Sequence, residues 1–188
     1  LATSGMANAA IINGSFETGT FAGWSTTSVS GGSTQVDTSD AGFTATDGSY
    51  FANLSATSYI SQNTSWSAGD ILSFDWNFNA NDNTYWNDFS IFMVKDSFGT
   101  TLEYITLANV TSVGSYNASG WNTYDYTFAS DNVGSITFGV INWGDNVADS
   151  QLYVDNVYTT NVPEPATAVL LGLGLTGLGI ARRRRTSK

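Results

Sequence analysis

The chain has 188 residues with 16 acidic and 6 basic side chains, and it contains neither cysteine nor histidine. The lack of cysteine excludes disulfides, thiol nucleophiles and thiolate metal sites. The lack of histidine excludes a Ser-His-Asp triad and the usual zinc hydrolase sites. Carboxylates and hydroxyls remain, so an oxygen-lined calcium site and a two-carboxylate glycosidase are both allowed.

Charge divides sharply along the chain. Between Ala10 and Val162, fifteen acidic residues face a single base, Lys95, whereas the tail that follows has five bases and one acid. An acidic domain of this kind repels phosphate backbones, so we expect no nucleic-acid partner. The composition suits a soluble surface protein or one that collects divalent cations.

The N-terminal residues resemble the end of a secretory signal peptide. Ala7-Asn8-Ala9 has the A-x-A pattern of a signal-peptidase site, which predicts cleavage before Ala10. Residues 1–9 are therefore interpreted as a signal-peptide remnant. A coil of small residues is the alternative.

Residues 10–161 are predicted to form one domain, an antiparallel jelly-roll β-sandwich. Period-two alternation of apolar and polar residues identifies the strands. The expected strands are Tyr50–Leu54, Tyr59–Asn63, Leu72–Asn79, Phe89–Lys95, Leu102–Leu107, Asn122–Phe128, Ile136–Val140 and Leu152–Thr159. Turns are expected at residues 30–33, 68–70 and 117–120, which are rich in glycine, serine and asparagine.

Three segments resemble galactose-binding-like jelly rolls and related carbohydrate-binding modules. They are Ile11–Gly19 with the following Gly23-Trp24, then Thr46–Ala52, and finally Leu152–Val157. In that group, an N-terminal glutamate and an aspartate of the last strand often hold a structural calcium ion. The resemblance implies this role for Glu17 and Asp155, with the Asp47 turn nearby. The alternative is that all three are solvated loop or strand-end acids.

Two polar loops contain aromatic residues and are the candidate ligand-binding segments. Residues 79–88 hold Tyr85 and Trp86 between amides and acids, and residues 142–146 hold Trp143 in the same setting. A flat ring against the apolar face of a sugar, with amides and carboxylates on its hydroxyls, is the expected mode of recognition. The acids that would bond hydroxyls, or hold a second cation, are Asp82, Asp88 and Asp145. The alternative is that these tryptophans pack in the core or rim, as expected for Trp76.

The C-terminal segment 162–188 has three parts in a fixed order. Pro163-Glu164-Pro165 precedes an apolar run from Ala166 to Ala181, and four arginines follow: Arg182, Arg183, Arg184 and Arg185. The run would make a helix of about 24 Å, short of the ~30 Å hydrocarbon core, and the arginines would keep the C-terminus in the cytoplasm.

This segment resembles the PEP-CTERM sorting signal of Gram-negative bacteria. The resemblance implies export, processing by an exosortase-type membrane protease and delivery to the cell surface or extracellular matrix. The protein would be anchored transiently in the inner membrane through a short transmembrane helix. A permanent tail anchor without processing is the alternative.

Two classes of function fit these features. The preferred interpretation is a non-catalytic, exported cell-surface or matrix protein that binds polysaccharide and serves adhesion, biofilm or floc formation. Calcium, in a structural role, is the expected cofactor. The alternatives are a carboxylate-dependent polysaccharide-active enzyme and a purely structural surface protein without a glycan ligand.

Overall fold

The computed structural model describes residues 10–145 and 147–161. The predicted signal-peptide remnant 1–9, the PEP-CTERM motif, its membrane helix and its arginine cluster lie outside the described residues. The described elements are β1 (Ser25–Asp37), β2 (Ser39–Asp40), β3 (Phe43–Thr44), β4 (Phe51–Trp66), β5 (Ile71–Asn79), β6 (Phe89–Asp96), β7 (Thr101–Asn109), α1 (Val110–Val113), β8 (Asn122–Thr127), β9 (Asn132–Ile141) and β10 (Gln151–Thr160).

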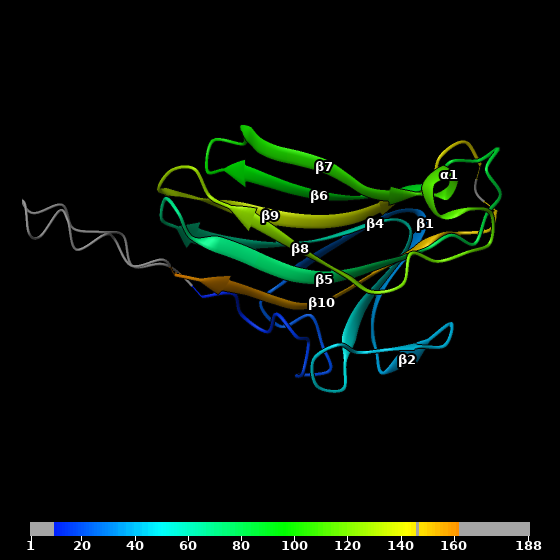
Figure 1. Cartoon of the computed structure of the whole chain (residues 1–188), viewed down its shortest axis with the longest axis horizontal. Helices are drawn as coiled ribbons and strands as arrows, with labels where there is room; N and C mark the ends of the chain where they lie inside the picture. Colours follow the sequence, from blue (N-terminus) through cyan, green and yellow to red (C-terminus); the bar gives the residue numbers. More distant parts are fainter. Residues whose placement is uncertain (1–9, 146, 162–188) are drawn as a thin grey trace, which may run out of the picture.

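The long strand β4 joins the two layers of an antiparallel sandwich. Its first half pairs with β10 and its second half with β9, while β1 runs beside both halves. One hydrogen-bonded ladder, in the order β7-β6-β9-β4-β10-β5-β8, is thereby folded over on itself. We call the layer of β7, β6 and β9 the upper sheet and the layer of β10, β5 and β8 the lower sheet (Figure 1). The predicted β-sandwich is confirmed.

The fold-over of β4 depends on unusual backbone at its middle. Ala56 has a positive φ of 52°, and the register of the neighbouring strand β1 shifts between Val29 and Ser33. A Cβ on Gly32 would collide with the carbonyl oxygen of Thr57, so glycine is required at this close approach. Residues 30–33, predicted as a turn between strands, therefore lie inside β1 as a bulge.

Aromatic rings from both sheets meet in the core. Phe74 of the lower sheet lies 4.8 Å from Phe92 and 4.7 Å from Phe138 of the upper sheet, measured between ring centroids. Trp66 stacks on Phe128 at 4.4 Å. The alternating pattern of β5 predicted this inward face correctly. Trp76, expected in the core, is only partly buried but packs against it.

Other sequence predictions differ in extent from the structure. The expected strands 50–54 and 59–63 are parts of one continuous strand, β4. The four-residue helix α1 interrupts the otherwise β structure. The first and last segments do meet, since Val157 N donates to Gly14 O at 3.0 Å.

The two ends of the sandwich differ. The chain enters and leaves near one end, and α1 lies with the 80–88 and 142–150 segments at the other, which we call the loop end (Figure 1). Among residues 10–145 and 147–161, no helix is long and apolar enough to cross a bilayer.

Candidate functional site

The loop end brings the two predicted ligand loops into one surface. Asp88 Oδ1 accepts a hydrogen bond from Trp143 N at 2.8 Å. Gly144, with φ 99°, lies against the Trp86 ring so closely that a Cβ there would overlap it. Because β6 and β9 are paired, the segments that precede β6 and follow β9 emerge side by side. Two loops far apart in sequence thus share one site.

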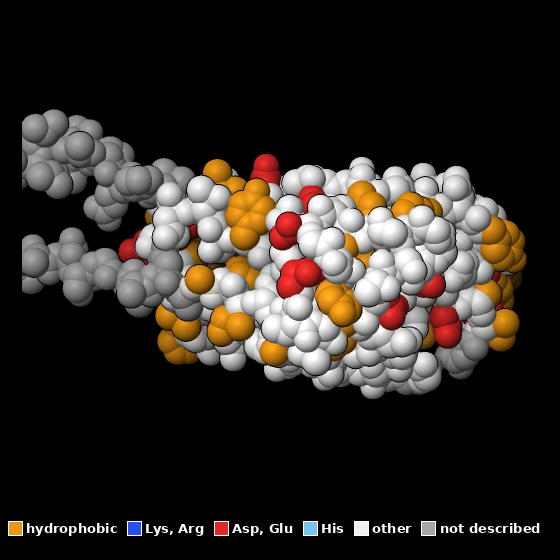
Figure 2. All heavy atoms as spheres, turned by 90° about the horizontal axis from the view of Figure 1, so that it is seen from below, with side chains coloured by type: hydrophobic (Ala, Val, Ile, Leu, Met, Phe, Trp, Pro, Cys, Tyr) orange, Lys and Arg blue, Asp and Glu red, His pale blue; other side chains and the backbone are white. Residues whose placement is uncertain are grey.

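Two aromatic residues of this surface are largely exposed, whereas the third, Trp86, is partly buried. Tyr85 is 81% exposed and Trp143 is 62% exposed. Tyr85 and Trp86 meet edge to face, with ring centroids 4.8 Å apart. A hollow of about 280 Å³ at the same end is lined by Asn87, Phe89 and Trp143. Hydrophobic and acidic side chains gather at the end of the domain away from the termini (Figure 2).

The three predicted loop acids differ in how deeply they are buried. Asp145 Oδ1 accepts a bond from Val147 N at 3.1 Å, within the loop. Asp82 and Asp88 lie beneath the surface and are buried. Burial raises the pKa of Asp88, against the opposing effect of hydrogen bonds from Trp143 and Ser150. These two acids therefore support the surface from below.

Of the predicted calcium ligands, Asp155 is the most enclosed. Its Oδ2 accepts bonds from Thr46 N at 2.7 Å, Thr46 Oγ1 at 3.1 Å and Asp47 N at 2.9 Å, and its Oδ1 accepts one from Asn156 N at 2.7 Å. Burial raises the pKa of Asp155, and the same bonds oppose that rise. This carboxylate fixes the 46–50 turn against β10.

Glu17 holds the same turn from the other side. Its Oε1 accepts bonds from Ser49 N and Tyr50 N, each at 2.8 Å. Its carboxylate lies against Gly48, where a Cβ would overlap it. Asp47 Oδ2 accepts a bond from Ser15 Oγ at 2.6 Å. The sequence thus identified three residues that lie in one loop cluster.

Whether this cluster suits calcium depends on its oxygens. In the part of the chain that the structure describes, no three acidic side chains come close enough together to hold a metal ion. A cation at Glu17 and Asp155 would need backbone carbonyls, hydroxyls or water to reach six to eight oxygens. Both amide bonds to Glu17 fall on Oε1, which leaves lone pairs on Oε2, whereas the four bonds to Asp155 match the acceptor capacity of a carboxylate. Calcium at this cluster stays a prediction.

A polar network on the outer face of the lower sheet was not predicted. Asp40 Oδ2 accepts bonds from Tyr153 Oη at 2.8 Å, Gln151 Nε2 at 2.7 Å and Asn53 Nδ2 at 3.1 Å. The β2–β3 hairpin carries Asp40 beneath this face, and Figure 1 shows it below β10. Burial is the main cause of the raised pKa of Tyr153. The sequence did not indicate this network, because no sequence pattern predicts that the β2–β3 hairpin covers this face of the sheet.

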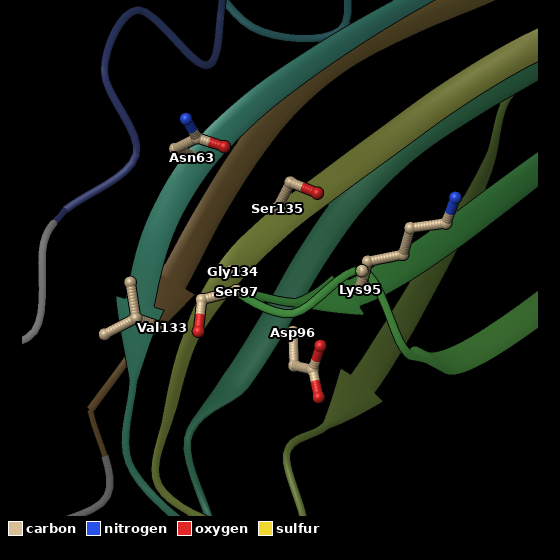
Figure 3. A pocket seen from close by; sticks show the side chains of 8 residues that line it. Asn63, Lys95, Asp96, Ser97, Val133, Gly134 and Ser135 are labelled. Atoms are coloured by element: carbon tan, nitrogen blue, oxygen red, sulfur yellow. The ribbon is translucent and has the colours of Figure 1, made fainter.

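A hollow of about 360 Å³ lies at the opposite end of β6, beside the β6–β7 turn. The side chains of Lys95 and Asp96 on its wall point in different directions (Figure 3). Asp96 Oδ1 caps the turn, accepting bonds from Phe98 N at 2.9 Å and Thr100 N at 2.8 Å. None of the predicted ligand or metal residues lines this hollow.

Comparison with known proteins finds a sorting motif in the chain and solved structures of similar fold. Residues 161–185 match the PEP-CTERM protein-sorting motif. A search of curated protein sequences finds no match. The chain is similar to the solved structure of TmCBM61 in complex with β-1,4-galactotriose, with a TM-score of 0.55 and 19% identity over 80% of this chain and 96% of the other.

Two further solved structures share the architecture. The K3 adhesin domain of Lys-gingipain from Porphyromonas gingivalis matches with a TM-score of 0.51 and 16% identity, over 81% of this chain and 100% of the other. The enzymatically active domain of bacteriophage CBA120 tailspike protein 4 matches with 0.52 and 13%, over 81% of this chain and 21% of the other. At these identities the likeness is one of fold.

The domain therefore shares the β-sandwich fold of TmCBM61 and of the K3 adhesin domain. The chain also carries a PEP-CTERM sorting motif, which implies an exported, cell-surface protein processed by an exosortase.

Proposed function

We propose that this domain is a non-catalytic polysaccharide-binding module that works at the cell surface or in a biofilm matrix. The observation that supports this function best is the loop-end surface, where Tyr85 and Trp143 are exposed and a hollow is lined by Trp143 and Asn87. Exposed apolar side chains that gather in one patch mark a contact surface, whereas single exposed rings are ordinary. The fold is shared with a module solved in complex with a galactose oligosaccharide.

The surface combines the two kinds of contact that sugars need. The Tyr85 and Trp143 rings offer flat apolar faces, and the Asn87 amide that lines the hollow with Trp143 offers its Nδ2 donors for hydroxyls. Asn87 Oδ1 already accepts bonds from Thr111 N at 2.8 Å and Thr111 Oγ1 at 3.0 Å. The backbone below is fixed, because Asp88 holds Trp143 N and Gly144 packs against Trp86. A rigid platform loses little entropy on binding.

The enzymatic alternative finds little support at this site. A glycosidase needs two carboxyl groups that reach the scissile bond. Of the predicted loop acids only Asp145 is not fully buried, whereas Asp82 and Asp88 both lie beneath the aromatic surface. They are placed to hold the loops and not to touch a bound chain.

The test is retention of the full-length protein on polysaccharides, with the host's own exopolysaccharide and β-1,4-galactan first in the panel. Trp143→Ala should weaken binding by about 1–3 kcal/mol, since one stacked ring is lost. Phe98→Ala, which truncates a 93% exposed ring on the β6–β7 turn, is the matched control and should bind normally.

Release of new reducing ends is measured in the same samples. Binding without release supports the proposal. Hydrolysis that a single Asp or Glu substitution abolishes would replace it with the enzymatic alternative, and failure to retain any polysaccharide would leave a structural surface protein.

A further inference from the structure

Two buried acids lie close to each other under the loop-end surface. Asp82 is 2% exposed and Asp88 is fully buried. Their backbones are anchored, because Asp82 O accepts a bond from Tyr116 N at 2.9 Å and Asp88 O accepts one from Val110 N at 3.0 Å. After burial itself and the opposing hydrogen bonds, the charge of Asp82 also raises the pKa of Asp88. Both carboxylates therefore lie buried in one loop.

Two buried oxygens at this end have no hydrogen-bond partner. They are Asp82 Oδ2 and Asn142 Oδ1. Asn142 Nδ2 donates to Asp149 Oδ1 at 2.9 Å. Because an ionised carboxylate only accepts hydrogen bonds, this contact fixes the orientation of the amide and leaves its oxygen as the free atom. Both unpartnered atoms are thus acceptors.

Further contacts place the two oxygens in one neighbourhood. Asn81, next to Asp82, donates through Nδ2 to Asp149 O at 3.1 Å, so Asp149 is bonded from both loops. Asn142 also adjoins Trp143, whose amide donates to Asp88. The two acids and the amide oxygen belong to one cluster between the 80–88 and 142–150 segments.

No basic side chain in the described domain balances this cluster. Lys95 is the only base between residues 10 and 161. Asp88 directly precedes β6 and Lys95 lies near its other end. Seven residues of extended strand separate them, about 23 Å at ~3.3 Å per residue. Buried charges are normally paired or bound to a metal, and a water molecule would satisfy the oxygens but not the charge.

We propose that the loop end holds a divalent cation of the calcium type, with Asp82 Oδ2 and Asn142 Oδ1 as ligands and Asp88 as the second negative charge. Calcium prefers carboxylate and amide oxygens and tolerates irregular shells that water and carbonyls complete. In the described residues no three acidic side chains come close enough together to hold a metal ion, so backbone carbonyls, hydroxyls or water would have to complete the shell here. The ion would tie together the loops that carry Tyr85, Trp86 and Trp143.

The cation site is tested on the full-length protein with terbium(III) as the probe. Terbium occupies calcium sites, and nearby tryptophan and tyrosine rings sensitise its emission. Wild-type protein should show sensitised emission that calcium displaces. Asp82→Asn keeps the shape and removes the charge, and it should weaken terbium binding at least tenfold. Asp125→Asn, an exposed acid on β8, is the matched control and should bind as wild type does.

A second measurement needs no variant. Hydrogen exchange of wild-type protein in calcium and in chelator should show slower exchange in residues 80–88 and 142–150 when calcium is present. Unchanged exchange in both segments, or terbium binding that Asp82→Asn leaves intact, would overturn the site and indicate that a proton neutralises the pair. Neither readout involves polysaccharide, so failure here is distinct from failure of the proposed function.

Discussion

Two sets of buried or partly buried carboxylates in this domain have opposite surroundings. On the lower-sheet side, Asp40 Oδ2 and Asp155 Oδ2 each accept three hydrogen bonds. At the loop end, Asp82 Oδ2 accepts none, and Asp82 and Asp88 are both buried in one loop. Burial of an acid therefore does not by itself indicate a cation site. The number of donors around each oxygen decides whether a further positive charge is needed.

The largest effect is expected where the donors are most numerous. Asp155→Ala should lower the free energy of unfolding by about 3 kcal/mol, because the amides of Thr46, Asp47 and Asn156 would lose their acceptor. Urea unfolding measures this loss. Asp125→Ala, on an exposed side chain, should stay within about 0.5 kcal/mol of wild type. A loss below 1 kcal/mol for Asp155→Ala would mean that water replaces the carboxylate.

A smaller effect is expected at Tyr153, which donates to Asp40. Tyr153→Phe should cost about 1.5 kcal/mol at neutral pH, the lower value for a hydrogen bond to a charged group. Burial raises the pKa of Tyr153, so its contribution is fully present below the unfolded value of about 10 and is lost as pH rises through the folded pKa. Stability of Tyr153→Phe should therefore fall less steeply above pH 10.

The matched control for this series is Tyr158→Phe, on the exposed side chain next to β10's bulge. Denaturant unfolding at several pH values between 7 and 11 compares the three proteins. An alkaline slope that Tyr153→Phe leaves unchanged would contradict the assignment of the network.

The smallest effect concerns calcium at the cluster predicted from sequence. Glu17 accepts two amide bonds, and Gln at this position keeps an acceptor oxygen. Glu17→Gln should therefore reduce the calcium-dependent gain in stability by about 1 kcal/mol, the value for calcium at several times its Kd. Asp82→Asn should reduce it more. Melting curves in calcium and in chelator measure both, and equal losses would remove the distinction between the two regions.

Much of the fold could be predicted because alternation in single strands reflects which face is buried. Leu72, Phe74 and Phe78 lie in the core as their spacing indicates. The course of β4 could not be predicted, because it depends on a positive φ at Ala56 and on a bulge in another strand. Local glycines therefore suggested a turn at residues 30–33.

The candidate site could be predicted in part. The local sequence identified the 79–88 and 142–146 segments as polar loops with aromatic residues and acids. The structure brings those two loops together. The sequence could not show that Asp82 and Asp88 lie below the surface, because loop burial depends on segments such as 110–117 that pack over them. The Asp40 network likewise depends on a hairpin placed by tertiary contacts.

We propose that polysaccharide binds at the loop end. This claim is tested most directly by hydrogen exchange of the full-length protein with and without the polysaccharide that retains it best. We predict protection in residues 83–89 and 142–149 and unchanged exchange in the β2–β3 hairpin. Protection confined to residues 37–44 and to the paired strands β4 and β10 would contradict the claim and place the ligand on the lower sheet.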